Sequence, residues 1–573
     1  MLSYRKLAMR VLGRPFHTGR IDSPRPASQR AAAFILTAAM LTTLAAPAFA
    51  DIWHIENGDI TISAGESGNN VTQNNNTTYG DTNTIITNQN KDTASSHTVT
   101  IEAKDKDDKV EVTLKDVNID TSSRNKAAVS VTGEGDTNIK LDGDNALKSD
   151  IYRSGIYGSG SGSLTISGGE NDSLTAQGGS GADGISSSGS LTISGGTVTA
   201  NGDDGGRGIS SSGSVTISGG STVTANGGSG TISGGDGIWS GGGVTISGGS
   251  TVTANGGDGK DDYGGDGICS DSGDVTISGG STVTANGGNG GSLVGGDGIR
   301  SGGGLTVSDG TVTAKGGNGD SKDGYGGDGI RSGGVVTISG NTVNASGGYG
   351  GKVGGYGICS FDRVAISGGT VEAAGGNGST GGGSGIYSSV IDLSGSLELT
   401  AKAGSPTGKA LLQNGRELDL DTIKDKLGPG AKVTATDANG ETKQVSIPRP
   451  VEPEEPVIPE ESSSSSDGGS ATPSAPVSPL PGLTVTDRDG QRISYTSTQS
   501  GNTLTVCVGR LTASFRISLA ALRQLRAEGI ETITFQTILC STTLSVDELL
   551  AMGGEDAEAV LTHRFTDSSL TVG

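Results

Sequence analysis

The sequence predicts an all-β fold, with a right-handed parallel β-helix of about nine regular rungs at its centre. Gly-Ile pairs recur along the chain, at Ile156, Ile185, Ile209, Ile238, Ile268, Ile299, Ile330, Ile358 and Ile386. These eight intervals cover 230 residues, and a mean period just under 29 indicates stacked supersecondary units. Glycine contributes 103 of 573 residues without a Gly-x-y period, and aromatic residues only 3%, which argues against collagen and against a bulky globular core.

Each repeat contains three short runs with the period of a β-strand. In the repeat at Gly237 these runs are 237–240, 244–249 and 251–257, where apolar and hydroxyl side chains alternate. The side chains expected to point inward are Ile238, Val244, Ile246, Val252 and Ala254. The Gly-Gly and Asn-Gly pairs between the runs are expected to supply positive-φ residues for sharp corners. Right-handed crossovers are the default for parallel strands.

The first 50 residues have the order of a secretory signal. Seven basic residues and one acidic residue precede an apolar run at 31–46, and Pro47 and Ala48-Phe49-Ala50 follow it. This order is typical of a signal peptide, and sixteen apolar residues are short for a membrane-spanning helix. We expect cleavage near Ala50, a secreted or cell-surface protein, and no membrane insertion of the mature chain. A retained N-terminal anchor is the alternative.

Composition divides the remaining chain into five segments. Residues 51–155 carry longer alternating runs and are expected to form irregular first rungs and a cap. The regular β-helix covers 156–388 and a second cap 389–447. Residues 448–482 are rich in Pro, Ser and acidic side chains, a composition that favours a linker. Strand-like and helix-like runs alternate in 483–573, which predicts a small α/β domain.

Charge and cysteine positions limit the classes of partner. The net charge is -22, and without residues 1–50 the chain has 33 basic and 61 acidic residues, or -28. Such a surface repels nucleic acid and suits solubility or cation binding. Cys269 and Cys359 occupy the same slot three rungs apart, about 14 Å at ~4.8 Å per rung, beyond disulfide reach. Cys507 and Cys540 are a candidate pair in the small domain.

An aspartate precedes the Gly-Ile pair in four consecutive rungs. These residues are Asp236, Asp266, Asp297 and Asp328. Carboxylates stacked ~4.8 Å apart repel one another unless they are solvated or bridged, and Ca²⁺ prefers such oxygen ligands. The column is therefore a candidate calcium site, with solvated turn residues as the alternative. The stretch 256–264 matches the Gly-Gly-x-Gly-x-Asp-x-U-x calcium repeat only once, which chance explains in so Gly-rich a chain.

A variable residue follows each anchor isoleucine, and alternation places it on the outer surface. Large side chains in this slot, with tyrosines at nearby corners, form a candidate carbohydrate-binding surface. The predicted residues are Trp239, Arg300, Arg331, Tyr387, Tyr263 and Tyr325. Aromatic rings and guanidinium groups along a long, regular face suit an extended polymer. Ordinary surface variation is the alternative.

The sequence gives little support for an active site. His54, His97 and His563 lie outside the rungs, and the chain shows no nucleophile elbow, zinc spacing or phosphate loop. Carboxylates sit at repeated turn positions rather than in one distinctive pair. The sequence therefore predicts a protein without enzyme activity.

Residues 95–400 resemble a family of secreted Firmicutes β-helix proteins labelled carbohydrate-binding domain-containing proteins. The resemblance rests on ValGluValThrLeuLysAspValAsnIleAsp at 110–120, AlaAlaValSerVal at 127–131, AsnIleLysLeuAspGlyAspAsnAlaLeuLys at 138–148, and the ThrIleSerGlyGly and ThrValThrAla repeats. It implies a right-handed β-helix that binds plant-type polysaccharides with bound calcium. No binding residue of that family maps onto this chain.

Together these observations predict a secreted, non-catalytic polysaccharide-binding protein whose partner is a plant-type or host glycan. The low aromatic content and near-identical rungs favour an alternative, a structural or adhesive surface repeat protein without a sugar site. A polysaccharide lyase or hydrolase on the same fold is the third hypothesis.

Overall fold

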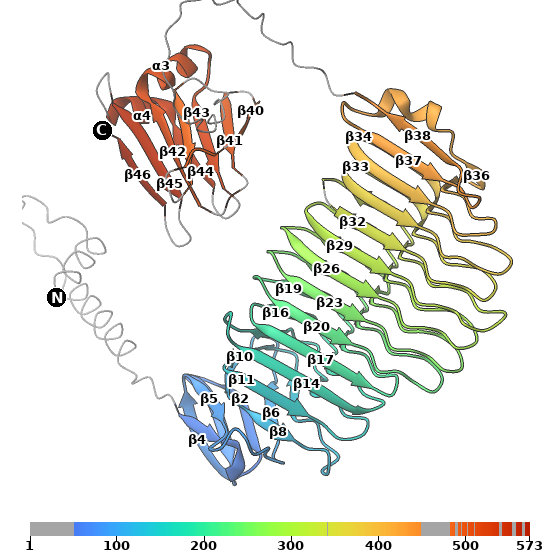
Figure 1. Cartoon of the computed structure of the whole chain (residues 1–573). Coiled ribbons are helices and arrows are strands. Elements are labelled where there is room, and N and C mark those ends of the chain that lie inside the picture. Colours follow the sequence, from blue (N-terminus) through green and yellow to red (C-terminus); the bar gives the residue numbers. More distant parts are fainter. Residues whose placement is uncertain are drawn as a thin grey trace, which may run out of the picture. The chain divides into compact units, whose positions relative to one another are not determined.

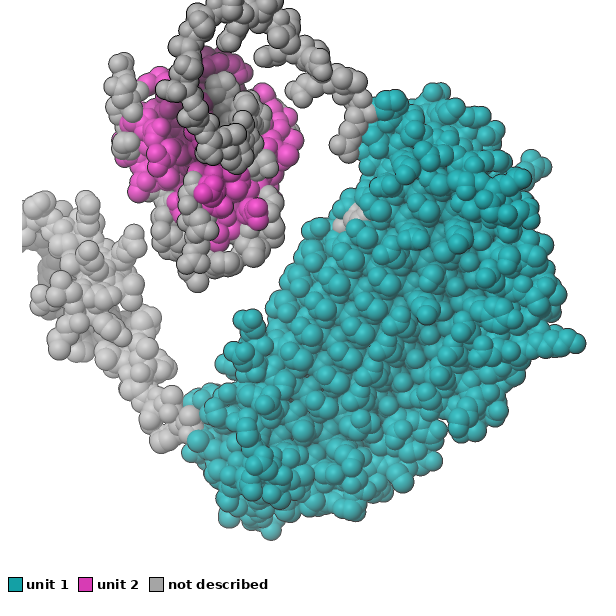
Figure 2. All heavy atoms as spheres, viewed as in Figure 1, with its two compact units in different colours: residues 1–453 teal, residues 454–573 magenta. Residues whose placement is uncertain are grey.

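The structure, a computed structural model, describes residues 51–340, 342–448 and most of 482–572. The gaps in the last range are 488–490, 494, 501, 509, 511, 538–540, 553–556 and 564–567. The predicted signal segment, most of the predicted linker and Cys540 lie outside the described residues. Two compact units are present, 1–453 and 454–573 (Figure 2). Within the described ranges, no helix is long and apolar enough to cross a membrane.

The all-β prediction is confirmed. Strands make up 52% of the structure, and stacked parallel coils form a β-solenoid of about 15 turns (Figure 1). Each turn contributes one strand to each of three stacked columns of strands. Two long strands, β33 (Ile358–Ala374) and β34 (Ile386–Lys402), run through all three columns.

The strands of each column pair in parallel with their counterparts one turn away. The first column contains β6 (Val99–Ala103), β9 (Val129–Gly133), β12 (Ile156–Gly158), β15 (Ile185–Ser187), β18 (Ile209–Ser211), β21 (Ile238–Ser240), β24 (Ile268–Ser270), β27 (Ile299–Ser301), β30 (Ile330–Ser332) and β35 (Leu411–Gln413). The second contains β1 (Ile52–His54), β5 (Thr84–Thr87), β7 (Lys109–Lys115), β10 (Asp136–Asp142), β13 (Leu164–Ser167), β16 (Leu191–Ser194), β19 (Val215–Ser218), β22 (Val244–Ile246), β25 (Val275–Ile277), β28 (Leu305–Val307) and β31 (Val336–Ile338). The third contains β8 (Asn118–Asp120), β11 (Asp144–Lys148), β14 (Ser173–Ser180), β17 (Thr197–Asp203), β20 (Thr222–Asn226), β23 (Thr251–Asn255), β26 (Ser281–Asn286), β29 (Gly310–Lys315), β32 (Thr342–Ser346) and β37 (Lys432–Thr436).

Antiparallel hairpins close both ends of the stack. At the start, β2 (Ile60–Gly65), β3 (Gly68–Gln73) and β4 (Asn76–Asp81) pair antiparallel, next to the 3₁₀ helix η1 (Ile55–Asn57). At the other end, β36 (Arg416–Glu417) pairs with β35 and β38 (Thr442–Ser446) with β37, and η2 (Leu420–Lys426) lies between them in sequence. The hairpins occupy strand edges that would otherwise be open to pairing with other chains.

The interior of the solenoid is aliphatic, as the period-two pattern predicts. All five side chains expected to point inward are at most 1% exposed. The residue two positions after each anchor isoleucine, which is a serine in every rung but the first, also faces inward. The Ser240 hydroxyl donates to the carbonyl oxygens of Gly213 and Gly243 at 2.8 and 3.1 Å. A small hydroxyl in this slot satisfies carbonyl groups that a buried corner would otherwise leave unpaired.

The glycine pairs have two different roles, and only one of them was predicted. Gly248 and Gly249 have φ of 66° and 72°, as expected for sharp corners. Gly256 and Gly257, which follow Asn255, are not positive-φ residues, so that part of the prediction is wrong. A Cβ on Gly256 would instead fall on the backbone of Gly265, because two legs of the chain run past each other at backbone contact.

These legs form a glycine flange, defined as residues 256–265 and their counterparts in neighbouring turns. The flange contains the long loops after the third-column strands in Figure 1. Some of its backbone hydrogen bonds join the two legs of one turn, and others join successive turns. Gly265 N donates to Gly257 O within a turn at 2.9 Å, and Gly288 N of the next turn donates to Gly265 O at 2.8 Å. Glycine is required at Gly256, Gly257, Gly264 and Gly265, because a Cβ at each of them would meet the backbone of the other leg or of a neighbouring turn.

The second unit is β-rich, with two sheets of four strands and two short helices. One sheet contains β39 (Leu483–Thr486), β42 (Ala513–Ser518), β45 (Glu558–His563) and β46 (Ser568–Val572). The other contains β40 (Thr496–Ser500), β41 (Thr503–Cys507), β43 (Thr532–Gln536) and β44 (Ser541–Ser545). Helix α3 (Leu519–Ala527) starts at Ser518, whose side chain accepts from Ala521 N, and α4 (Val546–Met552) follows β44.

The flange geometry predicts that two glycines only two residues apart respond differently to the same substitution. A Cβ on Gly383 would coincide with the Gly355 carbonyl group, whereas a Cβ on Gly381 would lie 3.5 Å from Val353 Cγ2, an ordinary contact. We expect Gly383→Ala to lower the free energy of unfolding by roughly 1–3 kcal/mol. Gly381→Ala should change it by less than about 0.5 kcal/mol. Denaturant titration followed by circular dichroism measures both, and equal midpoints for the two variants would contradict the packing described for the flange.

Candidate functional site

Two neighbouring rows of stacked side chains run along the first column of strands, and we call them the inner column and the outer column. The inner one contains Asp236, Asp266, Asp297 and Asp328, each two residues before an anchor isoleucine. The outer one contains the residues that follow the isoleucines, and strand pairing aligns them from turn to turn. In order these are Ser210, Trp239, Cys269, Arg300, Arg331, Cys359 and Tyr387. One column of predicted metal ligands therefore lies beside one column of predicted sugar-binding residues.

Each aspartate of the inner column accepts a backbone hydrogen bond from the next turn. Asp266 N donates to Asp236 Oδ1 at 2.8 Å, and Asp297 N to Asp266 Oδ1 at 2.7 Å. Asp328 N donates to Asp297 Oδ1, and Tyr356 N to Asp328 Oδ1, both at 2.7 Å. The last three aspartates are only 5–8% exposed, so they are not the solvated turn residues of the alternative reading. Each aspartate side chain therefore takes the place of a backbone carbonyl group as the acceptor that links one turn to the next.

Three arginines face the second oxygens of these carboxylates. Arg300 Nε lies 2.5 Å from Asp266 Oδ2, Arg207 Nε lies 3.4 Å from Asp236 Oδ2, and Arg331 Nη1 lies 3.7 Å from Asp328 Oδ2. Among the described residues, Asp297 forms no ion pair. The column thus combines four carboxylates with three guanidinium groups, and the unpaired carboxylate lies between two others.

Burial and mutual repulsion raise the pKa values of three carboxyl groups of this column, those of Asp236, Asp297 and Asp328. Burial raises the pKa of Asp236 to about 6, with a further contribution from the charge of Asp266. Burial also raises the pKa of Asp328 to about 6. The pKa of Asp297 lies well above its usual range because of burial and the charges of Asp328 and Asp266. Burial likewise raises the pKa values of the Cys269 and Cys359 thiols, which are free and buried, and this disfavours their reactive thiolate forms.

The outer column presents an uneven surface. Cys269 and Cys359 are at most 2% exposed, whereas the side chains of Arg300 and Arg331 are 45% and 46% exposed. Arg207 covers the Trp239 ring, its Cζ 4.2 Å from the ring centroid. The ring of Tyr387 stacks on Tyr356 at 5.0 Å. These two predicted aromatic contacts are therefore partly occupied by other side chains of the protein.

A shallow hollow of about 170 Å³ lies on the outer column. Its lining comprises Ser270, Asp271, Arg300, Ser301, Gly302, Arg331, Gly333 and Phe361. Arg331 Cζ lies 5.3 Å from the centroid of the Phe361 ring, which is 54% exposed. Phe361 was not among the predicted residues because it falls two positions after the variable slot of its turn, where the other rungs have Gly, Ser or Asp.

Tyr263 and Tyr325 lie in the glycine flange and not on the outer column. Parallel bridges align Tyr263 with Val294, Tyr325 and Val353 in successive turns. The two tyrosines are 50% and 41% exposed, and Lys352 Nζ lies 5.4 Å from the ring of Tyr325. The predicted sugar-binding set therefore divides into two separate columns.

The donor set of the inner column does not fit a calcium ion in this arrangement. Each Oδ1 already accepts a hydrogen bond from a backbone N–H group, and three of the four Oδ2 atoms face an arginine side chain. Within the described parts of the chain, no three His, Cys, Asp or Glu side chains converge as a metal site would require. Calcium binding stays a prediction that chelation experiments can test.

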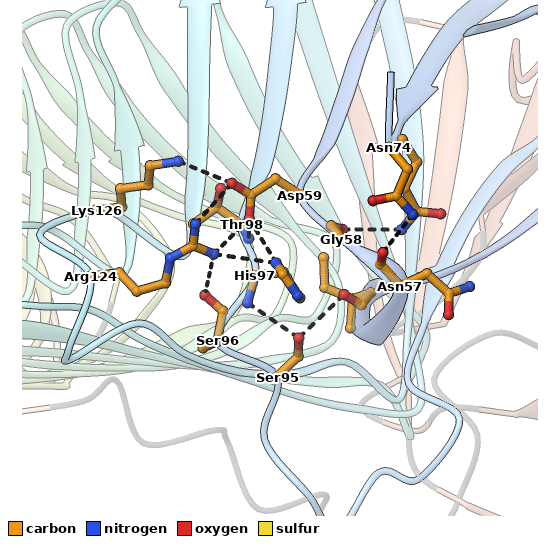
Figure 3. Close-up of polar contacts among 12 residues, drawn as sticks. Asn57, Gly58, Asp59, Asn74, Ser95, Ser96, His97, Thr98, Arg124 and Lys126 are labelled. Atoms are coloured by element: carbon orange, nitrogen blue, oxygen red, sulfur yellow. Dashed lines mark hydrogen bonds and ion pairs between the residues drawn. The ribbon is translucent and has the colours of Figure 1, made fainter. Parts of the chain in front are cut away.

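A second charged cluster, which the sequence did not predict, lies near the start of the solenoid (Figure 3). Arg124 Nη1 and Nη2 donate to the two oxygens of Asp59 at 2.7 and 3.1 Å, and Lys126 Nζ lies 3.0 Å from Oδ2. His97 Nδ1 is 3.1 Å from Oδ1. Partial burial raises the pKa of Asp59, but these hydrogen bonds outweigh it and hold that pKa well below its usual range. The cluster places one carboxylate among two cations and a histidine, and its hydrogen bonds tie the first turns together.

Comparison with protein-family models, with curated proteins and with solved structures finds no match for this chain.

The raised pKa values give the inner column a defined pH dependence. Between about pH 4 and pH 6 the folded column binds more protons than the unfolded chain, so its contribution to stability is complete below that window and falls as pH rises through it. Asparagine at position 297 imitates the protonated side chain and retains the acceptor for Asp328 N. We expect Asp297→Asn to match the wild type near pH 4.5. At pH 7.5 it should have the higher free energy of unfolding, because the wild-type carboxyl group is then buried beside two other acidic groups.

Denaturant titrations of both proteins at the two pH values measure this difference. Asp261→Asn, at an exposed position of the flange, is the control and should show no pH-dependent difference. A stability difference between Asp297→Asn and wild type that is the same at both pH values would show that Asp297 is ionised at neutral pH.

Proposed function

We propose that this protein is an exported, non-catalytic β-solenoid that binds polysaccharide along its outer column. The observation that carries the proposal is the alignment of Arg300, Arg331 and Phe361 around one hollow on a straight, repetitive face. A polymer with a repeating unit can contact such a face over several turns at once, so weak contacts add along the chain.

The chemistry of the hollow suits sugar hydroxyl groups. Arg300 Nε is held by Asp266, and Arg300 Nη2 lies 3.1 Å from the Cys269 sulfur. These contacts fix the guanidinium plane and reduce the side-chain entropy lost on binding. The exposed Phe361 ring offers an apolar surface for the C–H face of a sugar, and the Asp271 carboxylate offers an acceptor for hydroxyl groups. Binding sites commonly combine such apolar surface with a few polar groups that fix orientation.

Export is the part of the proposal that rests on sequence alone. The basic, apolar and small-x-small order of residues 1–50 supports it, and we place the mature protein outside the cell or at its surface. The absence of enzyme activity is likewise a proposal. Its support is that each carboxylate of the inner column accepts a backbone hydrogen bond within the protein, and that three of the four also face an arginine.

A structural or adhesive repeat protein is the second candidate. The observation that favours it is that most charged side chains of the two columns contact one another, and Trp239 and Tyr387 are covered by Arg207 and Tyr356. In this reading the columns stabilise a stiff spacer, and no sugar binds.

Retention on insoluble and soluble polysaccharides, with calcium and with chelator, tests the proposal. We expect retention on at least one glycan class, and about tenfold weaker binding, or ~1.4 kcal/mol, for the variant combining Trp239→Ala, Arg300→Ala and Arg331→Ala. Because loss of Arg300 leaves the buried Asp266 unpaired and can destabilise the fold, Phe361→Ala serves as a second variant that breaks no ion pair.

Lys260→Ala combined with Lys322→Ala removes two flange charges and is the control, which should bind as the wild type does. Unchanged binding by both column variants would disprove the outer-column assignment. No retention on any glycan would favour the structural spacer. Chelator-sensitive retention would support bound calcium.

A further inference from the structure

A second, more enclosed cavity lies at the start of the solenoid, where the stacking of the second column is incomplete. Strand β5 begins at Thr84 and pairs with β7 only from Val112 onward, so residues 109–111 of β7 have no strand ahead of them. The β3–β4 hairpin takes that place. The Asn69 side chain of β3 donates to Glu111 O at 2.8 Å, where a backbone N–H of a preceding turn would otherwise donate. The notch left between hairpin and strand has a volume of about 260 Å³.

The cavity is lined almost entirely by polar side chains. They are Asn69, Asp81, Thr82, Asn83, Thr84, Lys109, Glu111 and Thr113, together with the backbone of Gly68. Four of these polar side chains are more than nine-tenths buried: Asp81 is 0% exposed, Thr84 1%, Asn69 7% and Thr113 8%. A cavity with this lining offers hydrogen-bond donors and acceptors to a small polar ligand.

The protein supplies hydrogen-bond partners for the most buried of these groups, and no side-chain atom of the cavity is among the buried atoms without a partner in the described residues. Asp81 accepts from neutral donors alone among the described residues, namely Trp53 Nε1 at 3.0 Å and the backbone N–H groups of Asn83 at 3.1 Å and Asp51 at 3.5 Å. The Asn69 amide nitrogen donates to Thr84 Oγ1 at 2.9 Å as well as to Glu111 O, which leaves its Oδ1 as an acceptor. Thr113 lines the same cavity and is 8% exposed, so a ligand can reach its side chain.

The charges around the cavity narrow the class of ligand. Asp81 and Glu111 are unsuited to an anion, and Lys109 opposes a simple cation. Hydroxyl groups are both donors and acceptors, so adjacent hydroxyls on one ring can donate to a carboxylate and accept from an ammonium group. A volume slightly below that of drug-sized pockets suits one ring rather than a polymer segment.

We propose that this cavity binds a single neutral sugar ring, as a free monosaccharide or as the end of a glycan chain. The site is independent of the outer column, which lies on other strands and faces the side of a polymer. The Glu111 carboxylate accepts hydrogen bonds from the ring hydroxyls, and Lys109 and Thr113 donate to them.

Saturation-transfer NMR with free glucose, galactose, mannose and xylose tests this site. We expect the full chain to bind at least one of these sugars. Thr113→Val, which removes the hydroxyl at nearly constant shape, and Lys109→Ala should each weaken binding about fivefold or more. The matched control is Lys140→Ala, because Lys140 occupies the same register as Thr113 one turn later, outside the cavity lining.

The two proposals have separable outcomes. The cavity is supported if wild type, Lys140→Ala and Phe361→Ala bind the monosaccharide equally while Thr113→Val and Lys109→Ala bind it more weakly. It is overturned if none of the four sugars binds to the wild type, or if binding is insensitive to both cavity variants. Phe361→Ala bears on the outer column alone, so polysaccharide retention and monosaccharide binding can fail independently.

Discussion

The structure depends on one constraint, the in-register stacking of successive turns. Each residue lies over its counterpart one turn away, about 4.8 Å distant, so a side chain interacts first with a copy of its own position. For aliphatic residues this builds a continuous core. For aspartate it places like charges together, and the cost is reduced by backbone N–H donors and by arginines from the adjacent column. Which residue types can repeat at a surface position therefore depends on whether their side chains can stack on one another in successive turns.

The glycine flange is the strictest consequence of that stacking. At the corners, glycine is needed for its backbone angles, as at Gly249 with φ 72°. In the flange it is needed because the two legs and the neighbouring turns share one hydrogen-bonded backbone network, without room for a Cβ. A short aliphatic core can support turns of nearly 29 residues because a large part of each turn packs through its backbone. This explains why a chain with so few aromatic residues still forms an ordered stack.

Sequence reasoning succeeded where periodicity carried the information. The Gly-Ile interval located the turns, and alternation identified Ile238, Val244 and Val252 as core residues. It failed where contacts join residues that are far apart in the sequence. It also failed where one sequence pattern is compatible with two different structural roles. Gly256 looks like a corner glycine in the sequence, and only the path of the return leg shows its packing role. The pairing of Asp59 with Arg124, 65 residues away, leaves no local pattern. Asp266 was recognised as a stacked carboxylate, but its partners depend on Arg300 projecting back by one turn.

A perfect repeat gives every turn the same chemistry, so a specific site requires positions where the repeat changes. The outer column acquires its hollow because Arg300 and Arg331 lie between the buried Cys269 and Cys359, and because Phe361 replaces the Gly, Ser or Asp of other turns. The notch at β7 exists because the first turn is incomplete and a hairpin covers only part of it. Both candidate sites are thus departures from the repeat, whereas the inner aspartates are part of it. Regular stacking supplies stiffness and length, and the irregular positions are where selective recognition can arise.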